Sequence, residues 1–449
     1  MNQKIVIIGC GAAGWSAAVA ARKIDKKAQI TIIEQGKYPL YERGGIPFVI
    51  QGDIPNFEAL VNFPLKYYKF MKIQLQTEAK VIDIDSASKE VTFENKQKKK
   101  NQISYNSLII ATGATPFVIP VPGHILPEVF GVRTIEDGKT ILKTCMKTKK
   151  AVVIGARFVG LETAVALKKN DIEVTVVELR PQILDGILDS ELANRIKNEL
   201  ENKGIMFVLG TGISEILGKD HVKAARVGSY EAKADMVIMA TGVRGNTEIA
   251  QGTGVELGET KLIKVNERME TNIKAIYAAG DCTEDLHEIT GKSTVSQLGT
   301  NAITQGRVAG VNAAGGLMKN PKILGSCVCK LFDTEIASTG LTEKYAKMNG
   351  IDCVSASVFS PTRPKSHPDI DYIRIKLVAN RENRKIVGAQ IIGKEQAGLR
   401  IDMISLAIKK GATINDLMFL DHAYSPLISK PIDPMSSVAE VLEKKLLYS

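Results

Sequence analysis

The hydrophobic residues near the start of the chain form short continuous runs on either side of an alanine-rich segment. Residues 4–8 and 30–33 are such runs, and residues 12–24 between them are expected to form a helix. Apolar runs without polar alternation are typical of parallel strands whose sheet is covered on both faces. This part of the chain therefore predicts a β-α-β unit.

The same plan occurs a second time further along the chain. An apolar run at 151–154 precedes an expected helix near 159–170 and a further run at 174–178. Beyond about Leu324 apolar and polar residues alternate, as in 373–378, which predicts an antiparallel sheet followed by helices. The pattern therefore predicts two α/β nucleotide-binding domains and a third domain of different construction.

The composition is that of an ordinary globular chain. Its 449 residues, 44% of them hydrophobic, suffice for several domains. No apolar run reaches the roughly 20 residues that span a bilayer, and the first strand begins without a secretory signal before it. The six cysteines form neither a C-x-x-C pair nor a zinc-ligand spacing. These observations predict a cytoplasmic protein with no membrane span, disulfide framework or metal site.

The formal net charge is +10, and part of it lies in the lysine-rich run at 96–100. This run separates two strand-like segments and is most simply a solvated hairpin tip. It has no interleaved aromatic residues, so nucleic-acid binding is not expected. A basic surface could instead attract phosphorylated ligands or an acidic electron-transfer protein.

The sequence Gly-Cys-Gly-Ala-Ala-Gly at residues 9–14 follows the first strand and opens the first helix. In that context Gly9 permits a tight turn, Gly11 lets the backbone approach a pyrophosphate, and Gly14 lets the helix pack close to the strand. The free N–H groups at the helix N-terminus favour phosphate. Glu34 ends the second strand, where it can accept hydrogen bonds from ribose hydroxyls. The loop therefore predicts a dinucleotide site.

Two later segments complete a family pattern. Ala-Thr-Gly-Ala-Thr-Pro at 111–116 and Ile-Tyr-Ala-Ala-Gly-Asp at 276–281, together with the first loop, resemble the pyridine nucleotide-disulfide oxidoreductase family. The resemblance covers essentially the whole chain. It is closest to the branch of CoA-disulfide reductases, NADH oxidases and NAD(P)H-dependent sulfur or polysulfide reductases. It implies FAD in the first site, with the Asp281 carboxylate on the ribityl chain, and a homodimer.

The resemblance also implies an architecture: α/β, with two Rossmann-like domains and a C-terminal α+β dimerisation domain. The domains would be a discontinuous FAD-binding domain at 1–118 and 246–322, an NAD(P)H-binding domain at 119–245 and a dimerisation domain at 323–449. The residues assigned to FAD are Gly9, Gly11, Ala12, Ala13, Gly14, Glu34, Gln35, Arg43, Val81, Thr112, Gly113, Gly280, Asp281, Gly299 and Thr300. Those assigned to the nicotinamide nucleotide are Gly155, Arg157, Phe158, Val159, Gly160, Glu162, Glu178 and Gly242.

The second nucleotide loop departs from the pattern at one position. Arg157 stands where the middle glycine would let the backbone approach a pyrophosphate. Its guanidinium could bind the phosphates, weaken NADH binding, or pair with Glu178 and partly close the site. Glu178 ends the next strand, where it favours NADH over NADPH by repelling a 2′-phosphate. Glu162 matches a family glutamate near the flavin–nicotinamide contact, although an exposed helix carboxylate is the plainer alternative.

The segment at 41–52 corresponds to the part of the family that carries the redox cysteine. The Gly-x-Pro-aromatic pattern is retained at 45–48, but Gly44 occupies the cysteine position. Glycine has no nucleophile to attack a disulfide, whereas hydride transfer from nicotinamide to flavin needs none. We therefore expect electrons to pass from NADH through FAD to a non-thiol acceptor: dioxygen, a quinone or an electron-carrier protein.

Further side chains are candidates for this chemistry. Arg43 could stabilise the negative charge of a reduced flavin, or be a surface or phosphate-binding arginine. In the family, two turns of the C-terminal domain present tyrosines to the redox cysteine across the dimer; here Tyr424 retains the second and His367 replaces the first. His367 could donate a proton near neutral pH, although a lone histidine is more often structural. Arg22 and Lys23 match positions that hold CoA phosphates in relatives, so CoA binding stays open.

Two other function classes remain open from the sequence. The chain could be a non-catalytic flavoprotein subunit in which Arg157 has abolished nucleotide binding. It could also be an electron-transfer subunit that depends on a protein partner, which the positive charge favours if that partner is acidic. Reduction of the flavin by NADH would exclude the first class, and steady turnover by a pure homodimer would count against the second.

Overall fold

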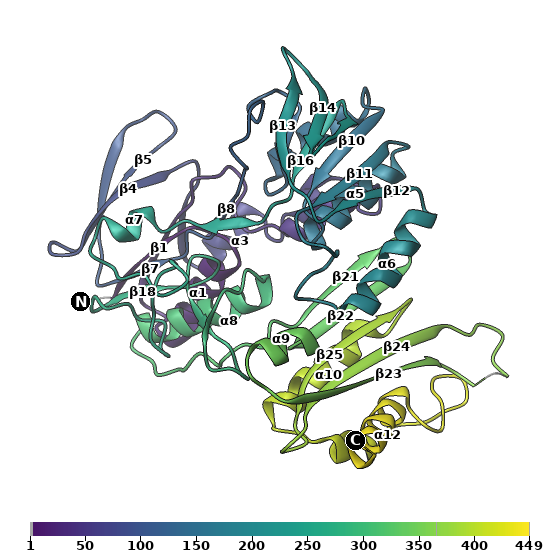
Figure 1. Ribbon diagram of the computed structural model, residues 1–449. Helices are drawn as coiled ribbons and strands as arrows, with labels where there is room; N and C mark the ends of the chain where they lie inside the picture. The colour runs from purple at the N-terminus through teal and green to yellow at the C-terminus, as the bar shows by residue number, and fades with distance from the viewer. Residues whose placement is uncertain (1–2, 365, 449) are drawn as a thin grey trace.

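The computed structural model describes residues 3–364 and 366–448. Figure 1 shows three parts: the N-terminal part at the left, a second α/β part at the upper right, and the C-terminal part below it. Two sheets are parallel and the large C-terminal sheet is antiparallel. The predicted fold class is therefore confirmed.

The first large sheet has five parallel strands in the order β18-β7-β1-β2-β3. These strands are β1 (Lys4–Ile8), β2 (Gln29–Ile33), β3 (Ile73–Gln76), β7 (Ser107–Ile110) and β18 (Ile276–Ala278). Helices α1 (Ala12–Ile24) and α8 (Gly299–Ala313) pack against each other beside this sheet. They approach closely because α8 presents glycines: a Cβ on Gly306 or Gly310 would lie 2.1 Å from a carbonyl oxygen of α1.

The second parallel sheet has the order β12-β11-β10-β16-β9. Its strands are β9 (Val129–Gly131), β10 (Lys150–Ile154), β11 (Glu173–Glu178), β12 (Ile205–Leu209) and β16 (Met236–Met239). The helices of this part are α4 (Ile135–Cys145), α5 (Phe158–Lys169) and α6 (Ser190–Asn202). The apolar run at 151–154 is fully buried, as its lack of polar alternation predicts.

Short antiparallel strands complete these two parts. Three-stranded sheets are formed by β4 (Lys80–Asp85), β5 (Glu90–Glu94) and β6 (Lys100–Ser104), and by β13 (Ile213–Gly218), β14 (Val222–Val227) and β15 (Tyr230–Lys233). Two-stranded pairs are formed by β8 (Ala114–Pro116) with β17 (Val243–Gly245), and by β19 (Asp285–Leu286) with β20 (Ser293–Thr294). The lysine-rich run lies at the exposed turn between β5 and β6, as predicted. The β8–β17 pair lies where the predicted division at 118/119 and 245/246 falls; the division itself stays a prediction.

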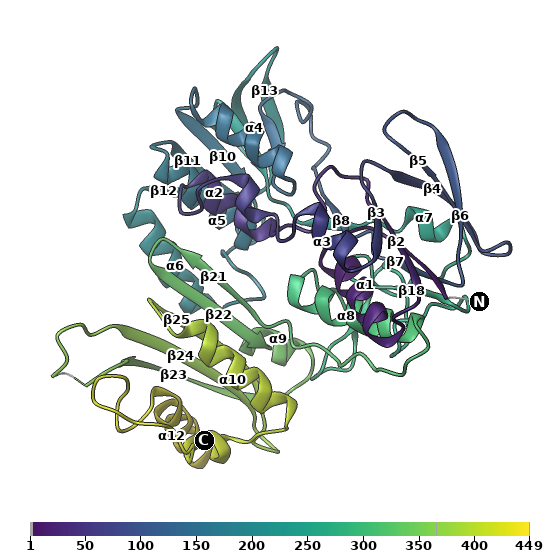
Figure 2. The same cartoon turned by 180° about the vertical axis from the view of Figure 1, so that it is seen from behind.

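The C-terminal sheet has the order β21-β22-β25-β24-β23. Its strands are β21 (Cys327–Leu331), β22 (Thr334–Gly340), β23 (Cys353–Pro361), β24 (Tyr372–Asn380) and β25 (Ile386–Gly393). The accompanying helices are α9 (Glu343–Met348), α10 (Ala397–Lys409), α11 (Ile414–Met418) and α12 (Pro434–Leu447). Figure 2 shows α10 and α12 lying along this sheet. Within the residues described, no helix has the length and apolar character needed to cross a membrane.

A buried ion cluster ties the C-terminal sheet to the second α/β part. The Lys376 ammonium on β24 lies 2.9 Å from the Asp189 carboxylate and 2.5 Å from that of Glu191, both at the start of α6. Asp189 also accepts a hydrogen bond of 2.6 Å from the Gln390 amide. Removing Lys376 would leave the buried Asp189 carboxylate without its cation, which is strongly destabilising. The cluster therefore fixes these two parts relative to each other.

The segment that holds Gly44 is anchored on the helices of the second part. Its short elements are η1 (Arg43–Gly45), α2 (Ile46–Ile50) and η2 (Phe57–Leu60), followed by α3 (Leu65–Phe70); α7 (Glu248–Gln251) lies later in the chain. The Asn170 amide donates a hydrogen bond of 2.8 Å to the carbonyl of Ile50. Gly138 on α4 lets the Phe57 ring approach, because a Cβ there would lie 2.4 Å from it. The segment is thus held in place by two helices of the second part.

Candidate active site

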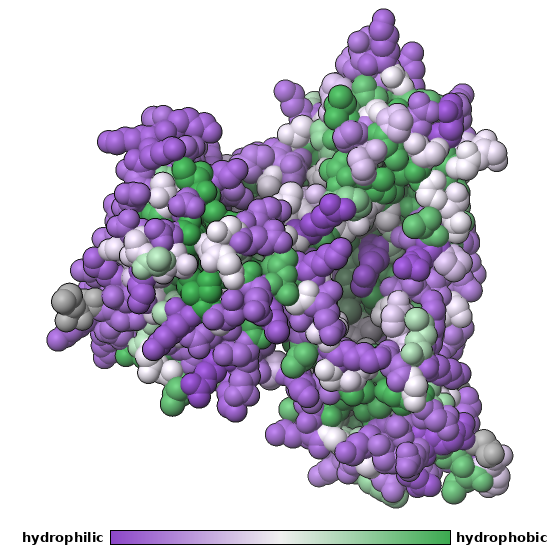
Figure 3. Space-filling model, turned by 60° about the vertical axis from the view of Figure 1, so that its left-hand side comes forward, coloured by the Kyte–Doolittle hydropathy of each residue, from purple (hydrophilic) through white to green (hydrophobic). Residues whose placement is uncertain are grey.

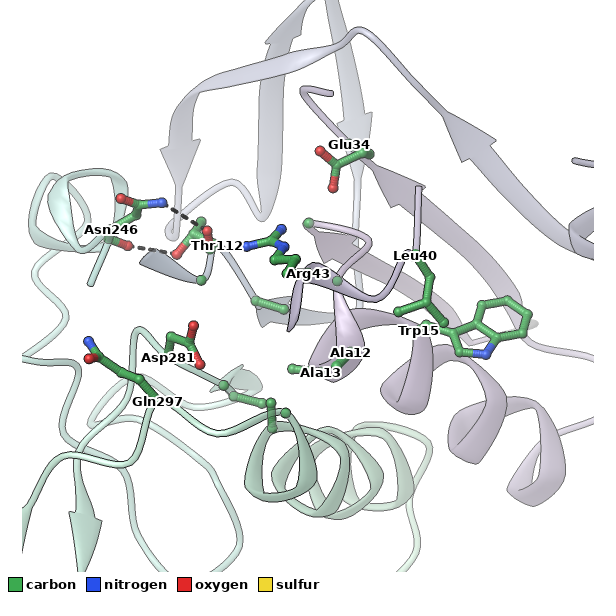
Figure 4. Close-up of a pocket in the computed structure, with 18 of the residues that line it drawn as sticks. Ala12, Ala13, Trp15, Glu34, Leu40, Arg43, Thr112, Asn246, Asp281 and Gln297 are labelled. Atoms are coloured by element: carbon green, nitrogen blue, oxygen red, sulfur yellow. Dashed lines mark hydrogen bonds between the residues drawn. The ribbon is translucent and has the colours of Figure 1, made fainter. Parts of the chain in front are cut away.

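One large cavity opens where the first sheet ends. Its volume is about 2050 Å³, larger than the 300–1,000 Å³ typical of a single small ligand. The first loop, the carboxyl end of β7, the segment around Gly44 and the start of α8 line it (Figure 4). Figure 3 shows the molecular surface hollowed between the second α/β part and the C-terminal part, with apolar side chains exposed in the hollow; the residues that line the cavity itself lie between Ile8 and Met318. The cavity therefore has room for a dinucleotide and a second ligand.

The first loop has the backbone geometry that a pyrophosphate site needs. Gly9 has φ +101°, and a Cβ on it would lie 2.2 Å from the carbonyl oxygen of Ala111. A Cβ on Gly14 would lie 1.9 Å from the Gly9 oxygen, so only glycine lets α1 start here. No side chain caps α1, and its first residues line the cavity. The amides at this helix N-terminus are therefore available to an anion.

Two carboxylates order the nucleotide loops. Glu34 accepts hydrogen bonds from the backbone amides of Cys10 at 2.6 Å and Gly36 at 2.7 Å. Glu178 does the same for Ala156 at 2.8 Å and for Arg180 at 2.9 Å. Each carboxylate has four lone-pair sites, so ribose hydroxyls can still bind there.

The predicted FAD residues gather in this cavity almost completely. Of that set, Gly14 alone does not line it, since Gly14 packs against Gly9 behind the loop. The lining members are Gly9, Gly11, Ala12, Ala13, Glu34, Gln35, Arg43, Val81, Thr112, Gly113, Gly280, Asp281, Gly299 and Thr300. Asn246 holds the segment that contains Thr112 and Gly113. Its backbone carbonyl accepts a hydrogen bond of 2.6 Å from the Thr112 hydroxyl (Figure 4).

Arg133 is a lining residue that the sequence analysis missed. Its guanidinium donates a hydrogen bond of 2.6 Å to the Asp281 carboxylate, and both side chains are largely buried. Its Nε is also buried and has no hydrogen-bond partner. Thr134 and Asp137 form a capping box that starts α4, and recognising this box would have placed Arg133 at a helix entrance. The pair brings a cation from the second part to the predicted ribityl carboxylate.

Gln305 holds the Gly280–Asp281 turn from behind. Its side-chain carbonyl accepts hydrogen bonds of 2.6 Å from the Gly280 amide and 3.0 Å from the Thr283 hydroxyl. Its amide donates a 2.8 Å bond to Asp285, a carboxyl whose pKa burial raises to about 6. All these groups are buried, so the turn depends on one side chain of α8.

We expect Gln305→Met to weaken FAD binding. Leaving the buried Gly280 amide without its acceptor costs about 1–3 kcal/mol, which corresponds to about five- to 150-fold in the FAD dissociation constant if the loss falls on the FAD-bound form. Flavin fluorescence on dilution measures this constant. The matched control is Thr304→Ala, an exposed neighbour on the same helix. Equal FAD affinity in both variants would contradict the positioning role of Gln305.

Arg43 points into the cavity rather than out to solvent (Figure 4). One guanidinium nitrogen lies 3.9 Å from where a Cβ of Gly11 would stand, beside the pyrophosphate loop. The same group lies 5.5 Å from the centre of the Tyr41 ring. Arg43 therefore places a cation in the cavity, where negative charge on a bound cofactor would be stabilised, whereas the charge of Arg133 is offset by Asp281.

Gly44 also lines the cavity, and the space beside it is open. A Cβ at this position would meet nothing within 4 Å, whereas a Cβ on Gly45 would lie 2.4 Å from the Leu60 side chain. None of the six cysteines lines this cavity. Burial raises the pKa of the Cys10 thiol to about 12, which leaves almost no thiolate at neutral pH.

The second nucleotide loop repeats the geometry of the first. Gly155 has φ +105°, and a Cβ on Gly160 would lie 2.0 Å from the Gly155 oxygen. Of the residues predicted to hold the nicotinamide nucleotide, the cavity is lined by Val159 and Glu162. Those outside it are Gly155, Arg157, Phe158, Gly160, Glu178 and Gly242. Arg157 is exposed at the N-cap of α5, and no ion pair joins it to Glu178 in the described part of the chain.

Glu162 is partly buried and lines the cavity, so the structure does not favour the plain exposed-carboxylate alternative. Burial raises the pKa of this carboxyl to about 8. It is therefore mostly neutral at pH 7 and becomes charged above about pH 8. The neutral form can donate a hydrogen bond into the cavity without adding negative charge.

This titration predicts a pH dependence. The rate of flavin reduction by NADH should fall about tenfold as pH rises through about 8, because an ionised Glu162 opposes negative charge arriving on the flavin by roughly 1–2 kcal/mol. Stopped-flow absorbance of the flavin measures the rate. Glu162→Gln should remove the pH dependence, and a variant with the same profile as wild type would contradict the assignment.

Three other candidates lie outside the cavity. His367 is bonded within its own turn, its Nδ1 accepting from the Asp369 amide at 3.1 Å, and Tyr424 is 50% exposed on the C-terminal part. Their predicted action across a dimer stays a prediction. Arg22 donates to backbone carbonyls, among them Met71 at 3.2 Å and Lys72 at 2.7 Å. Its role is therefore structural, whereas the neighbouring Lys23 lines the cavity.

Comparison with known proteins decides the family. The model of the "Pyridine nucleotide-disulphide oxidoreductase" family matches residues 3–306, and that of its dimerisation domain matches residues 327–435. The chain belongs to this family. It is 41% identical to an NADH oxidase of Methanocaldococcus jannaschii over 99% of both chains. It is 34% identical to an NAD(P)H sulfur oxidoreductase (CoA-dependent) of Pyrococcus furiosus, over 98% of this chain and 99% of the relative.

Solved structures agree with this assignment. An NAD-dependent persulfide reductase from A. fulgidus superposes with a TM-score of 0.95 at 36% identity, covering 99% of this chain and 83% of the other. As a member of the pyridine nucleotide-disulphide oxidoreductase family, the chain is an FAD-dependent pyridine nucleotide oxidoreductase with a C-terminal dimerisation domain. The first loop and the Gly280–Asp281 turn fit FAD, since one offers uncapped amides and the other a carboxylate facing the cavity.

Proposed function

We propose that this protein oxidises NADH through FAD and passes the electrons to an acceptor other than a disulfide. The observation that carries the proposal is the open space beside Gly44 in a cavity that no cysteine lines. Disulfide and persulfide reduction proceed by thiolate attack, and the buried thiols of this chain are held protonated. An NADH oxidase is among its full-length relatives.

Different residues of the chain bind the cofactor, orient it and stabilise charge. The amides of the first loop hold the pyrophosphate of FAD, and Asp281 orients the ribityl chain on a turn that Gln305 supports. When bound, FAD would supply the hydride acceptor for NADH and the electrons for the acceptor. Glu162 borders the space for the nicotinamide on α5, while Arg43 supplies positive charge and Arg133 holds the Asp281 carboxylate. Gly44 leaves the part of the cavity beside it sterically open to an acceptor.

The donor is NADH in preference to NADPH. Glu178 ends β11, and its carboxylate stands where an adenine ribose would bind. A 2′-phosphate there would meet this negative charge. The exposed Arg157 remains available to the pyrophosphate of NADH, because it has no ion pair with Glu178 among the described residues.

Anaerobic titration with NADH tests the proposal directly. The flavin absorbance should bleach with one equivalent of NADH and return on addition of dioxygen or a quinone, but not of CoA disulfide. A flavin that stays oxidised would reject the proposal in favour of a non-catalytic subunit. Reoxidation by CoA disulfide at a comparable rate would show that a thiol acts despite Gly44.

A second proposal concerns CoA. Lys23 and Arg307 line one arm of the cavity together with apolar residues of α1 and α8, such as Val19 and Val311. Two cations beside an apolar wall suit CoA, which carries phosphate groups. One relative is described as CoA-dependent. Calorimetric titration with CoA should show binding that Lys23→Glu abolishes. The absence of heat in the wild type would remove this proposal and leave the first intact.

A further inference from the structure

The surface around α3 combines exposed apolar side chains with lysines. Leu65 is 57% exposed and Phe70 is 77% exposed, and both belong to this short helix. Lys66, Lys69 and Lys72 are exposed around them, and none has a carboxylate within ion-pair distance among the residues described. An unpaired basic rim around an apolar centre is unusual for a surface that faces only water.

The end of α1 extends this surface. Arg22 binds the carbonyls of Met71 and Lys72, which places the last turn of α1 beside the end of α3 (Figure 2). That turn and the residues after it add three exposed side chains. We call the combined set the lysine patch; it consists of Ile24, Lys26, Lys27, Leu65, Lys66, Lys69, Phe70 and Lys72. Asp25 lies in the same stretch, and its carboxylate accepts a hydrogen bond of 2.8 Å from the Lys27 amide.

An aromatic cluster joins the lysine patch to the wall of the cavity. Trp15 and Phe63 line the cavity, and their ring centres lie 5.3 Å apart. Tyr67 stacks on Phe63 at 4.6 Å and reaches Phe70 at 6.1 Å. A protein docked on the exposed Phe70 would therefore be linked to the flavin cavity by side chains in contact.

From these observations we propose that the lysine patch docks an acidic one-electron carrier protein, which takes the electrons of the flavin. The inference rests on the proposed function, since it names the acceptor that function leaves open. Charge complementarity selects this occupant, because a basic rim steers an acidic partner and a small apolar centre suits a transient complex. A second copy of the chain fits less well: its net charge is +10, and its residues 394–449 carry equal numbers of basic and acidic side chains.

The electrons balance when two carrier molecules are reduced for each NADH oxidised. One NADH gives a hydride, that is two electrons and a proton, and becomes NAD⁺. Each oxidised carrier takes one electron, so two carriers are reduced and one proton is released to solvent. No cysteine is needed at any step, in keeping with the open space at Gly44.

The test compares acceptors and charge variants of the full-length holoenzyme. An acidic rubredoxin is the protein acceptor, a basic cytochrome c is the opposite-charge acceptor, and benzoquinone is the small one. The variant Lys66→Glu/Lys69→Glu/Lys72→Glu reverses the patch. Its matched control, Lys98→Glu/Lys99→Glu/Lys100→Glu, makes the same change of net charge at the exposed β5–β6 turn.

We expect kcat/KM for rubredoxin to fall by about tenfold or more in the patch variant, and similarly in wild type at high salt. Benzoquinone turnover should be unchanged in both variants, and the control should reduce rubredoxin within about twofold of wild type. Equal rubredoxin rates in the two variants, or a wild type that prefers cytochrome c, would overturn the docking site.

Three further outcomes are separable. Dissociation of the dimer by the patch variant, measured by sedimentation, would show that a second copy covers the patch and would also overturn the inference. Failure of wild type to turn over benzoquinone with NADH would reject the proposed function itself. Benzoquinone turnover without charge-dependent reduction of rubredoxin would reject the docking site alone.

Discussion

Gly44→Cys should confer a disulfide-reducing activity that, under the proposed function, the natural chain does not have. The new side chain fits because a Cβ at this position meets no atom within 4 Å. The thiol would lie in the cavity near Arg43, which favours the reactive thiolate. NADH-dependent reduction of CoA disulfide should rise by about 100-fold or more over wild type, because the new thiol provides nucleophilic catalysis that glycine cannot.

The matched control for this change is Gly44→Ser, which adds a side chain of similar size without a thiol. Only the cysteine variant should show the long-wavelength charge-transfer absorbance between a thiolate and the oxidised flavin. If wild type already reduces CoA disulfide as fast as the cysteine variant, Gly44 does not mark the position of a missing nucleophile. If neither variant gains activity but the charge-transfer band appears, the disulfide substrate does not reach the cavity.

Gly306→Ala should separate α8 from α1 and expel FAD. A Cβ at residue 306 would lie 2.1 Å from the carbonyl oxygen of Ala13, in the first turn of α1. A backbone atom cannot yield as a flexible side chain can, so the helices must move apart at a cost of about 1–3 kcal/mol or more. The first turn of α1 supplies the amides for the pyrophosphate, and Gln305 on α8 holds the Gly280 turn, so cofactor binding is lost with the packing.

Purified Gly306→Ala should contain little FAD and should melt several degrees below wild type. The flavin-to-protein absorbance ratio and thermal unfolding with and without added FAD measure both effects. Gly398→Ala on α10 is the matched control, since its Cβ would lie 3.8 Å from the nearest atom and alanine favours a helix by up to about 1 kcal/mol. Full FAD occupancy in both variants would show that α1 and α8 tolerate a wider separation.

Much of the nucleotide-binding fold followed from short stretches of sequence. The residues at 5–8 and 151–154 are buried apolar runs, and the helix expected at 12–24 has those bounds in the structure. The glycines at 9 and 14 are required by contacts within the same loop and its neighbouring strand end. Such features depend on residues close in sequence or on one repeated motif, so a linear pattern suffices to predict them.

Other features of the site depended on contacts that no linear pattern records. Arg133 meets Asp281 across 148 residues, and Gln305 supports Gly280 from a helix 25 residues later. The sequence offered an arginine before a capping box and a glutamine in a helix, neither of which indicates its partner. Glu162 is likewise buried only because the second α/β part packs against the cavity. This burial raises the pKa of its carboxyl.

The sequence by itself determined the two nucleotide loops, the acids that end their second strands and the glycine at residue 44, because each is a local property of the chain. Only the tertiary structure decided that Arg22 is bound to backbone carbonyls, that Arg43 points into the cavity, and that α3 and the end of α1 form one basic surface. These are relations between segments that fold together from distant parts of the sequence. Their physical origin is packing, which joins surfaces and buries charges irrespective of order along the chain.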